Sequence, residues 1–231
     1  MPVSQVRYLE QLNWQAPLAF EPDDEPIDRY NVAPTTRVQL MHLDEDGLRM
    51  SVEPWGYAPH WARGAGKRPP AINARLETAV RNRYWSSVWK HGRCLVPANG
   101  WYEWVKDPGD AKRKQPYYIQ LKSDEPIFYA AIGHFPRGRD GEQSDIDGFA
   151  IVTSASDQGM VDIHDRMPVV LPPDGAREWL KSRLAPEHVE NLARHHAEPV
   201  DSFEWFVVGK KVGNVKNKGA SLIQPSDRSL Q

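Results

Sequence analysis

The sequence is poor in cysteine, since Cys94 is the only one among 231 residues. A single thiol excludes an internal disulfide framework and a cysteine-rich zinc site, and it is typical of proteins from a reducing compartment. No apolar run reaches the length of a membrane span, and the first residues lack the basic and apolar regions of a signal peptide. We therefore expect a cytoplasmic protein that is neither secreted nor embedded in a membrane.

The sequence also lacks an excess of charge of one sign, because its formal net charge is −2. The charges are nevertheless uneven: residues 60–114 carry a formal charge of +8 and five of the nine tryptophans. Basic and aromatic side chains interleaved in this way are typical of surfaces that bind single-stranded nucleic acid. The alternative is that these rings lie in the core, which we expect for Trp85, Trp89 and Trp104. Trp61, which precedes a loop rich in glycine and arginine, is the best candidate for an exposed ring.

Composition and pattern predict an ordinary globular protein with one domain over residues 1–225 and a disordered tail over residues 226–231. Short apolar or alternating runs predict strands over residues 38–43, 48–54, 94–97, 102–105, 116–121, 127–134, 148–153, 169–171 and 204–208. Asp44-Glu45-Asp46-Gly47 between the first two runs predicts a hairpin with an acidic turn. Asn99-Gly100 predicts a second hairpin, and the runs after it predict one continuing antiparallel sheet. Helical spacing predicts helices over residues 6–13, 78–89, 174–184 and 186–195.

One stretch, residues 73–79, sets three different polar side chains on alternate positions. If it is extended, Asn73, Arg75 and Glu77 share one face, which favours the lining of a cleft over a packed sheet. The alternative is an exposed edge strand, because these are ordinary surface residues.

Two further side chains are candidates for proton transfer. Glu103 lies between aromatic residues in a predicted strand, and burial there would raise its pKa into the range of a general acid or base. His164 has Asp162 and Asp165 beside it as orienting partners. Either residue could instead be structural. The apolar neighbours of Cys94 predict a buried, unreactive thiol, and we expect no metal site and no cofactor.

Six segments together resemble the SOS-response-associated peptidase (SRAP) family. They are residues 30–34 (YNVAP), 55–59 (WGYAP), 73–78 (NARLET), 100–104 (GWYEW), 157–168 (DQGMVDIHDRMP) and 212–217 (VGNVKN). The resemblance runs from about residue 30 to residue 225. It implies an α+β fold with a mostly antiparallel, barrel-like β core and peripheral helices, and a monomer that binds single-stranded DNA and covalently captures abasic sites.

The resemblance also implies roles for individual residues. Asn73 would hold the N-terminal residue of the chain, Glu103 would transfer protons during removal of the initiator methionine and ring closure, and His164 would help to open the sugar. Arg75 would bind a phosphate beside the lesion and Trp61 would stack beside a base. The remaining residues assigned to DNA binding are Lys67, Arg68, Asn214 and Lys216.

The sequence departs from the family at its start, which reads Met1-Pro2-Val3 with no cysteine after the methionine. In the family that cysteine closes a thiazolidine on the sugar aldehyde. Three explanations are open: a start assigned too late in a longer chain, which we favour; Pro2 acting as a secondary amine; or DNA binding without covalent capture.

Two other functions remain as alternatives. The protein could be a non-covalent binder of single-stranded or junction DNA. It could also be a thiol peptidase that acts through Cys94 and His164, although the apolar setting of that thiol argues against it.

Overall fold

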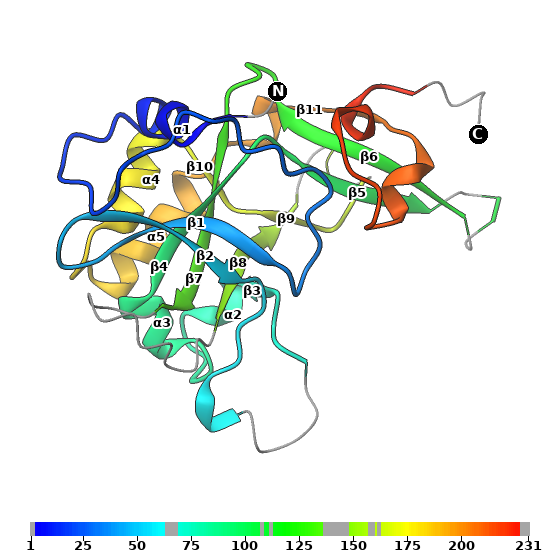
Figure 1. The fold of residues 1–231 in the computed structure, drawn as a ribbon. Helices are drawn as coiled ribbons and strands as arrows, with labels where there is room; N and C mark the ends of the chain where they lie inside the picture. Colours follow the sequence, from blue (N-terminus) through cyan, green and yellow to red (C-terminus); the bar gives the residue numbers. More distant parts are fainter. Residues whose placement is uncertain are drawn as a thin grey trace.

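The computed structural model describes residues 3–62, 69–106, 109–110, 113–135, 148–156, 160 and 163–226. Within these residues the chain forms one large mixed β-sheet, one small antiparallel sheet and helices packed around them (Figure 1). The fold class predicted from the sequence, α+β with mostly antiparallel strands and peripheral helices, is confirmed. The described strands do not close into a barrel, because β2 and β3 end the strand order of the large sheet.

The large sheet has the order β2-β1-β4-β7-β8-β3, with β10 paired to β7 and β9 paired to β8. All its pairs are antiparallel except β3 with β8. Its strands are β1 (Arg37–Leu43), β2 (Leu48–Pro54), β3 (Asn73–Arg75), β4 (Arg93–Ala98), β7 (Ile127–His134), β8 (Gly148–Ala155), β9 (Arg166–Pro168) and β10 (Val170–Leu171). The predicted hairpin of β1 and β2 is confirmed, and Asp44 Oδ1 closes its turn by accepting from the N–H groups of Asp46 and Gly47.

The small sheet has the order β11-β6-β5 and lies to the right of the large sheet in Figure 1. Its strands are β5 (Trp101–Lys106), β6 (Lys114–Leu121) and β11 (Phe203–Val207). The hairpin predicted at Asn99-Gly100 is therefore wrong, because β4 pairs with β1 and β7 while β5 pairs with β6. The chain changes sheets here, and a Cβ on Gly100 would lie 2.2 Å from the carbonyl oxygen of Ile119. The predicted single continuing sheet is likewise two sheets.

The helices cover the large sheet on the side away from the small one (Figure 1). They are α1 (Gln5–Leu12), α2 (Leu76–Ala79), α3 (Ser86–His91), α4 (Pro173–Leu180) and α5 (Pro186–His195). The 3-10 turns are η1 (His60–Ala62), η3 (Val200–Ser202), η4 (Lys210–Gly213) and η5 (Ala220–Ile223), and of these η4 and η5 lie beside the small sheet. The single helix predicted over residues 78–89 is wrong. Asn82 separates α2 from α3, because its Oδ1 accepts from the Tyr84 N–H and its C=O accepts from the Trp85 N–H.

A buried arginine joins the helices to the sheet. The Arg93 guanidinium donates to the carbonyl oxygens of Trp179, Trp89, Lys90 and Lys181, at the C-terminal ends of α3 and α4. Carbonyls there have no partner within their own helix, so the cation satisfies them and offsets the negative end of each helix dipole. Trp85 and Trp89 are 7% and 1% exposed in the same core, as predicted.

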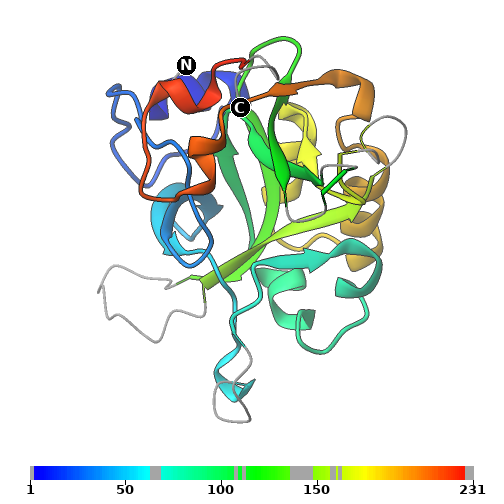
Figure 2. The same cartoon turned by 90° about the vertical axis from the view of Figure 1, so that its right-hand side faces the viewer.

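The two ends of the chain pack beside the small sheet (Figure 2). Asn31 has φ 52° and its Nδ2 donates to the carbonyl oxygens of Val212, Asn214 and Asn217, while Lys218 Nζ donates to the Asn31 carbonyl. These bonds tie residues 30–34 to residues 212–218. Ser226 was predicted to begin a disordered tail, but its N–H donates to the Val207 carbonyl at 2.9 Å; residues 227–231 lie outside the described residues.

Candidate functional site

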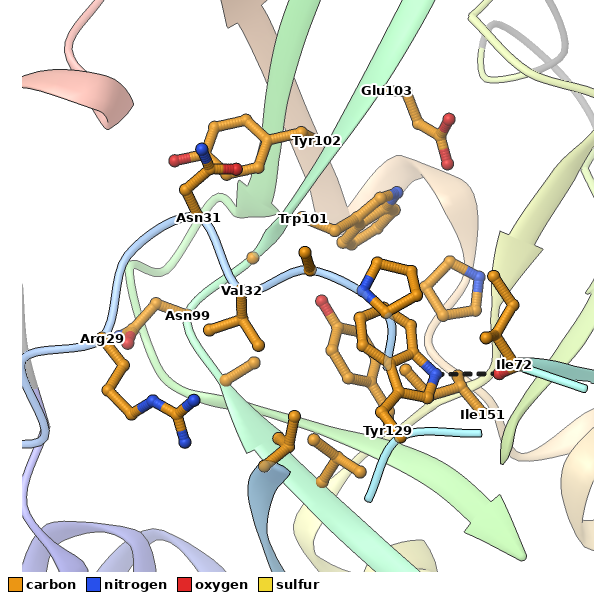
Figure 3. Close-up of a pocket in the computed structure, with 18 of the residues that line it drawn as sticks. Arg29, Asn31, Val32, Ile72, Asn99, Trp101, Tyr102, Glu103, Tyr129 and Ile151 are labelled. Atoms are coloured by element: carbon orange, nitrogen blue, oxygen red, sulfur yellow. Dashed lines mark hydrogen bonds between the residues drawn. The ribbon is translucent and has the colours of Figure 1, made fainter. Parts of the chain in front are cut away.

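A cavity of about 490 Å³ lies between the two sheets and the segment 29–34 (Figure 3). Its floor is apolar and buried, with Val96, Tyr129, Phe149 and Ile151 each at most 8% exposed. Its mouth is polar and is lined by Asn73, Glu103, His164 and Arg166. The structure therefore brings together the amide, the carboxyl and the imidazole singled out in the sequence, which come from β3, β5 and the loop before β9.

Glu103 is the acid at this mouth. It follows Trp101 and Tyr102 on β5 and is half-buried against the rings around it. Burial raises the pKa of the Glu103 carboxyl to about 6; the His164 imidazole acts against this rise and the Asp165 carboxylate adds to it. The sequence left open whether Glu103 is structural or a carboxyl with a raised pKa, and its burial here agrees with the second possibility. Both protonation states of this group are populated near neutral pH, which suits it to proton transfer.

His164 is held by its own loop. Its Nδ1 lies 3.0 Å from both the backbone N and the carbonyl O of Arg166, and 3.2 Å from Asp165 Oδ1. In the neutral ring Nδ1 accepts from the Arg166 N–H, which leaves the proton on Nε2; in the imidazolium, Asp165 balances the charge. The ring is 44% exposed and lines the cavity mouth.

Asn73 and Arg75 point away from the core because Ala74 between them is buried. The strand ends at Arg75, and Glu77 lies in the first turn of α2, so the predicted alternation of three polar side chains is wrong at its third member. Glu77 is instead bonded by both carboxylate oxygens to Arg166, at 3.0 Å each, and accepts from the Ala155 N–H. Its partial burial opposes ionisation, but these hydrogen bonds outweigh that and lower the pKa of Glu77.

Arg166 is a site residue that the sequence reasoning missed. Besides Glu77 it donates to the hydroxyl and carbonyl oxygens of Thr153, and it lines the cavity with its side chain 20% exposed. The only signal for it in the sequence is its position two residues after His164. Trp104 was also missed, because it is 37% exposed and lines the cavity; the expectation that it lies in the core is wrong.

Of the residues assigned to DNA binding, Trp61, Arg75, Asn214 and Lys216 belong to the described part of the chain, and none of them lines the cavity. Trp61 is 53% exposed, as predicted, with the Arg83 guanidinium 5.7 Å from its ring centre. Asn214 accepts from the Lys216 N–H, and Lys216 is exposed on the segment held by Asn31. Lys67, Arg68 and Pro2 lie outside the described residues.

The structure also bears on the thiol-peptidase alternative, on metal binding and on membrane insertion. Cys94 is fully buried, and burial together with the Glu53 charge raises the pKa of its thiol well above the ordinary value, as predicted for an unreactive core cysteine. In the described part of the chain, no three His, Cys, Asp or Glu side chains gather as they would around a metal ion. No helix among the described residues is long and apolar enough to cross a membrane.

Comparison with known proteins gives three findings. The model of the family described as SOS response associated peptidase (SRAP) matches residues 4–215. The chain is 47% identical over 203 residues to the abasic site processing protein YedK of Escherichia coli K12, covering 88% of this chain and 87% of that protein, and 31% identical to the abasic site processing protein YoqW of Bacillus subtilis, covering 89% of each. The crystal structure of a phage-related protein from Bordetella bronchiseptica is similar with a TM-score of 0.71 and 38% identity, over 90% of this chain and 92% of that one.

Proposed function

The chain belongs to the SOS response associated peptidase (SRAP) family, and from this premise we propose that it processes abasic sites in single-stranded DNA by capturing them covalently. The names of the relatives at 47% and 31% identity, both abasic site processing proteins, support the substrate class. The similarity covers almost nine-tenths of this chain and of each relative, which supports assigning the relatives' substrate class to this chain.

The observation that carries the proposal is the pair formed by Glu103 and His164 at the cavity mouth. An abasic sugar is mostly a closed ring, and its aldehyde becomes available only after a proton moves from the ring hydroxyl to the ring oxygen. A carboxyl with a pKa of about 6 and an exposed imidazole, close enough for their charges to interact, are the two groups such a transfer needs. His164 opens the sugar in this proposal, and Glu103 manages the protons of the capture step.

The attacking group is an amine at the head of the chain. The amine adds to the sugar aldehyde and forms an imine with loss of water, and a neighbouring thiol then closes a thiazolidine by forming a C–S bond. An α-amine suits this reaction because its pKa lies near 8, so a useful fraction is unprotonated at neutral pH. Val3, the first described residue, accepts at its carbonyl from the N–H of Ile27, a residue of the cavity wall, and Asn73 holds the residue that attacks.

The source of the amine is either a cysteine ahead of Val3 or Pro2. A cysteine gives the thiazolidine, whereas the secondary amine of Pro2 stops at an iminium, which borohydride reduces to a stable amine. If the nucleophile is a cysteine, the protein first removes its own initiator methionine, as the family does. Glu103 then also transfers protons during that peptide cleavage.

The positive groups around the mouth hold the strand. Arg75 is exposed on β3 beside Asn73 and has no ion-pair partner among the described residues, so it is available to a phosphate. Trp61 presents an exposed ring to a base next to the lesion. Asn214 and Lys216, both exposed, also contact the strand in this proposal, and the roles of Lys67 and Arg68 in DNA binding stay predictions from the sequence.

The test is an incubation with a single-stranded oligonucleotide that carries one abasic site, followed by denaturing electrophoresis. Two proteins are compared, the 231-residue chain and a chain that begins Met-Cys-Gly-Arg-Phe, each with and without borohydride. If only the protein that begins Met-Cys-Gly-Arg-Phe forms a stable adduct, the nucleophile is the cysteine. If the 231-residue chain forms an adduct, and does so only in the presence of borohydride, the nucleophile is Pro2. Glu103→Gln serves as the inactive control, and an oligonucleotide with an intact base shows the background. Absence of an adduct under all conditions contradicts covalent capture.

The second candidate function is non-covalent binding of single-stranded or junction DNA, and it is favoured by Arg75, which is exposed and has no ion-pair partner in the described part of the chain. It predicts an affinity that falls with salt and with Arg75→Ala but is unchanged in Glu103→Ala. A thiol peptidase acting through Cys94 is not proposed, because that thiol is fully buried.

A further inference from the structure

Glu77 and Arg166 form an ion pair beside the cavity mouth, and of the two only Arg166 lines the cavity. Both carboxylate oxygens of Glu77 accept from the Arg166 guanidinium, at 3.0 Å each. Arg166 Nη2 also donates to the carbonyl and hydroxyl oxygens of Thr153, at 2.6 and 3.1 Å. A planar guanidinium bonded to a carboxylate at two points and to a strand at a third has a fixed orientation. Glu77 therefore fixes a residue of the cavity wall without reaching the cavity itself.

Glu77 takes this position because β3 ends before it. The parallel register of β3 and β8 includes the pair Arg75↔Thr153, so a longer β3 would set residue 77 opposite Ala155. The chain turns into α2 instead, and the Glu77 carboxylate accepts from the Ala155 N–H at 3.1 Å. The side chain thus satisfies a backbone donor that the strand leaves without a partner. In this way Glu77 joins the end of β3 to the end of β8 (Figure 1).

Arg166 extends this connection to His164. Arg166 lies opposite Ala155 in the ladder of β8 and β9, and its backbone N–H donates to Nδ1 of the neutral His164 ring at 3.0 Å. A donor at Nδ1 leaves the ring proton on Nε2. The loop also has an anchor of its own, because the His164 N–H donates to the Met160 carbonyl at 3.0 Å. A chain of contacts therefore runs from Glu77 through Arg166 to the imidazole at the cavity mouth.

We propose that Glu77 is a positioning residue for His164. It holds Arg166 against β8, and the Arg166 backbone then keeps the imidazole in the tautomer that carries its proton on Nε2. A group that transfers protons must present the correct nitrogen in a fixed place, so this control bears on the chemical step. The inference rests on the proposed function, in which His164 opens the abasic sugar, and it adds a residue that does not touch the substrate.

The alternative is that Glu77 only stabilises the sheet. Loss of a partly exposed ion pair lowers stability by little, and a purely structural loss would leave the histidine tautomer unchanged. Glu125 provides a matched control, because both its carboxylate oxygens accept from Arg7 and its side chain is 37% exposed, against 38% for Glu77. Glu125 does not line the cavity. Glu125→Ala therefore removes a similar ion pair that has no link to His164.

The first test reads the tautomer directly and needs no DNA. Long-range proton–nitrogen NMR of isotope-labelled histidine is recorded at about pH 8.5, where a histidine ring is normally neutral. Comparison with His164→Gln identifies the His164 signals among those of the eight histidines. We expect a single tautomer with the proton on Nε2 in the unsubstituted protein and in Glu125→Ala, and a mixture of both tautomers in Glu77→Ala.

Two results of this measurement overturn the proposal. One is a mixture of tautomers in the unsubstituted protein, and the other is the same single tautomer in Glu77→Ala. If the alanine variant does not fold, Glu77→Gln takes its place, because glutamine keeps the size of the side chain but loses the charge and one of the two acceptor oxygens.

The second test measures the rate of adduct formation with the abasic oligonucleotide, using whichever of the two proteins above forms the adduct. Glu77→Ala should lower the rate at saturating DNA about tenfold, because a displaced proton-transfer group slows the chemical step. The DNA concentration that gives half of this rate should change by less than about twofold. Glu77→Asp keeps the carboxylate and should recover part of the rate, and Glu125→Ala should leave both quantities unchanged. A weaker affinity with an unchanged rate overturns the proposal, because Arg166 would then act on the DNA strand and not on His164.

The inference and the proposed function can fail separately. If no protein forms an adduct, covalent capture is wrong, and the tautomer of His164 still decides the role of Glu77. If the adduct forms and Glu77→Ala captures DNA at the unsubstituted rate, only the role of Glu77 is removed.

Discussion

The helix-covered core and the cavity share the large sheet but differ in how far their buried polar groups are hydrogen-bonded. In the core, Trp179 is fully buried and its Nε1 donates to the Cys94 carbonyl at 3.0 Å, and four carbonyls accept from Arg93. In the cavity, Trp101 has no acceptor for its Nε1 among the described residues, and Glu103 has a raised pKa.

This difference separates stability from function. Satisfied polar groups stabilise the core, whereas unsatisfied ones at the cavity are available to a ligand at some cost in stability. The division is not complete, because the core residue Trp89 also has a buried Nε1 without a partner in the described chain. Matched substitutions in the core and at the cavity can therefore test whether hydrogen-bonded polar groups contribute more to stability than those without a partner.

The largest effect is expected from the two tryptophans. Trp179→Phe leaves a void and removes the donor from buried carbonyls, so the free energy of unfolding should fall by about 2–4 kcal/mol. Trp101→Phe removes a donor that has no acceptor among the described residues and should cost less than about 1 kcal/mol. Denaturant titration of both variants measures the difference, and equal losses would contradict the comparison.

The second-largest loss of stability is expected at Asn31, because its side chain joins the cavity wall to residues 212–217 through hydrogen bonds. Asn31→Ala removes three hydrogen bonds and leaves alanine at φ 52°, which should lower the free energy of unfolding by about 1–3 kcal/mol. Asn31→Gly loses the same bonds but tolerates that φ, so it should be less harmful than alanine. Proteolysis near residues 212–217 should accelerate in both variants; unchanged digestion would show that another contact holds this segment.

Replacement of Glu103 should raise the free energy of unfolding, in contrast to the substitutions of Trp179 and Asn31. Its pKa is about 6 in the folded protein and 4.5 ordinarily, so the folded state binds the proton more tightly and loses stability as pH rises from about 4.5 to above 6. Glu103→Gln should therefore stabilise the protein by about 1 kcal/mol at pH 7.5, since solvent at the mouth screens part of the cost, and should change nothing at pH 4. Thermal unfolding at both pH values is the measurement, and a variant destabilised at pH 7.5 would show that the carboxylate is held by favourable contacts.

The smallest effect on stability should come from Arg75. Arg75→Ala removes an exposed side chain, so the free energy of unfolding should change by less than about 0.5 kcal/mol. Binding to single-stranded DNA should weaken, with the slope of log affinity against log salt reduced by about 1. Lys90→Ala, an exposed cation on α3 outside the cavity lining, is the control that should leave the slope unchanged.

The sequence predicts local features of this fold better than their assembly. The β1–β2 hairpin is predictable because Asp44 and Gly47 form its turn from adjacent residues. The path after Asn99-Gly100 is not, because turn residues say only that the chain bends. Which strand β5 pairs with depends on β6 and on the edges that β1 and β7 already occupy on β4.

The same limit applies to the site. Glu103 can be recognised from its aromatic neighbours along the strand, but Arg166 cannot, since its bonds to Glu77 and Thr153 join residues far apart in sequence. Glu77 shows the reverse error, because a polar alternation that looks like a single face is broken by the start of α2.

By itself the sequence determined where most of the strands lie, the inert setting of Cys94 and the chemical types of the side chains at the cavity, because these follow from local pattern and near neighbours; the α+β class followed from the family resemblance. Only the tertiary structure decided that Asn73, Glu103 and His164 share one cavity, and that Arg166 joins Glu77 to Thr153 beside it. The physical reason is that burial and strand pairing are set by segments distant along the chain, and these alone fix the pKa of a carboxyl and the partners of a backbone amide.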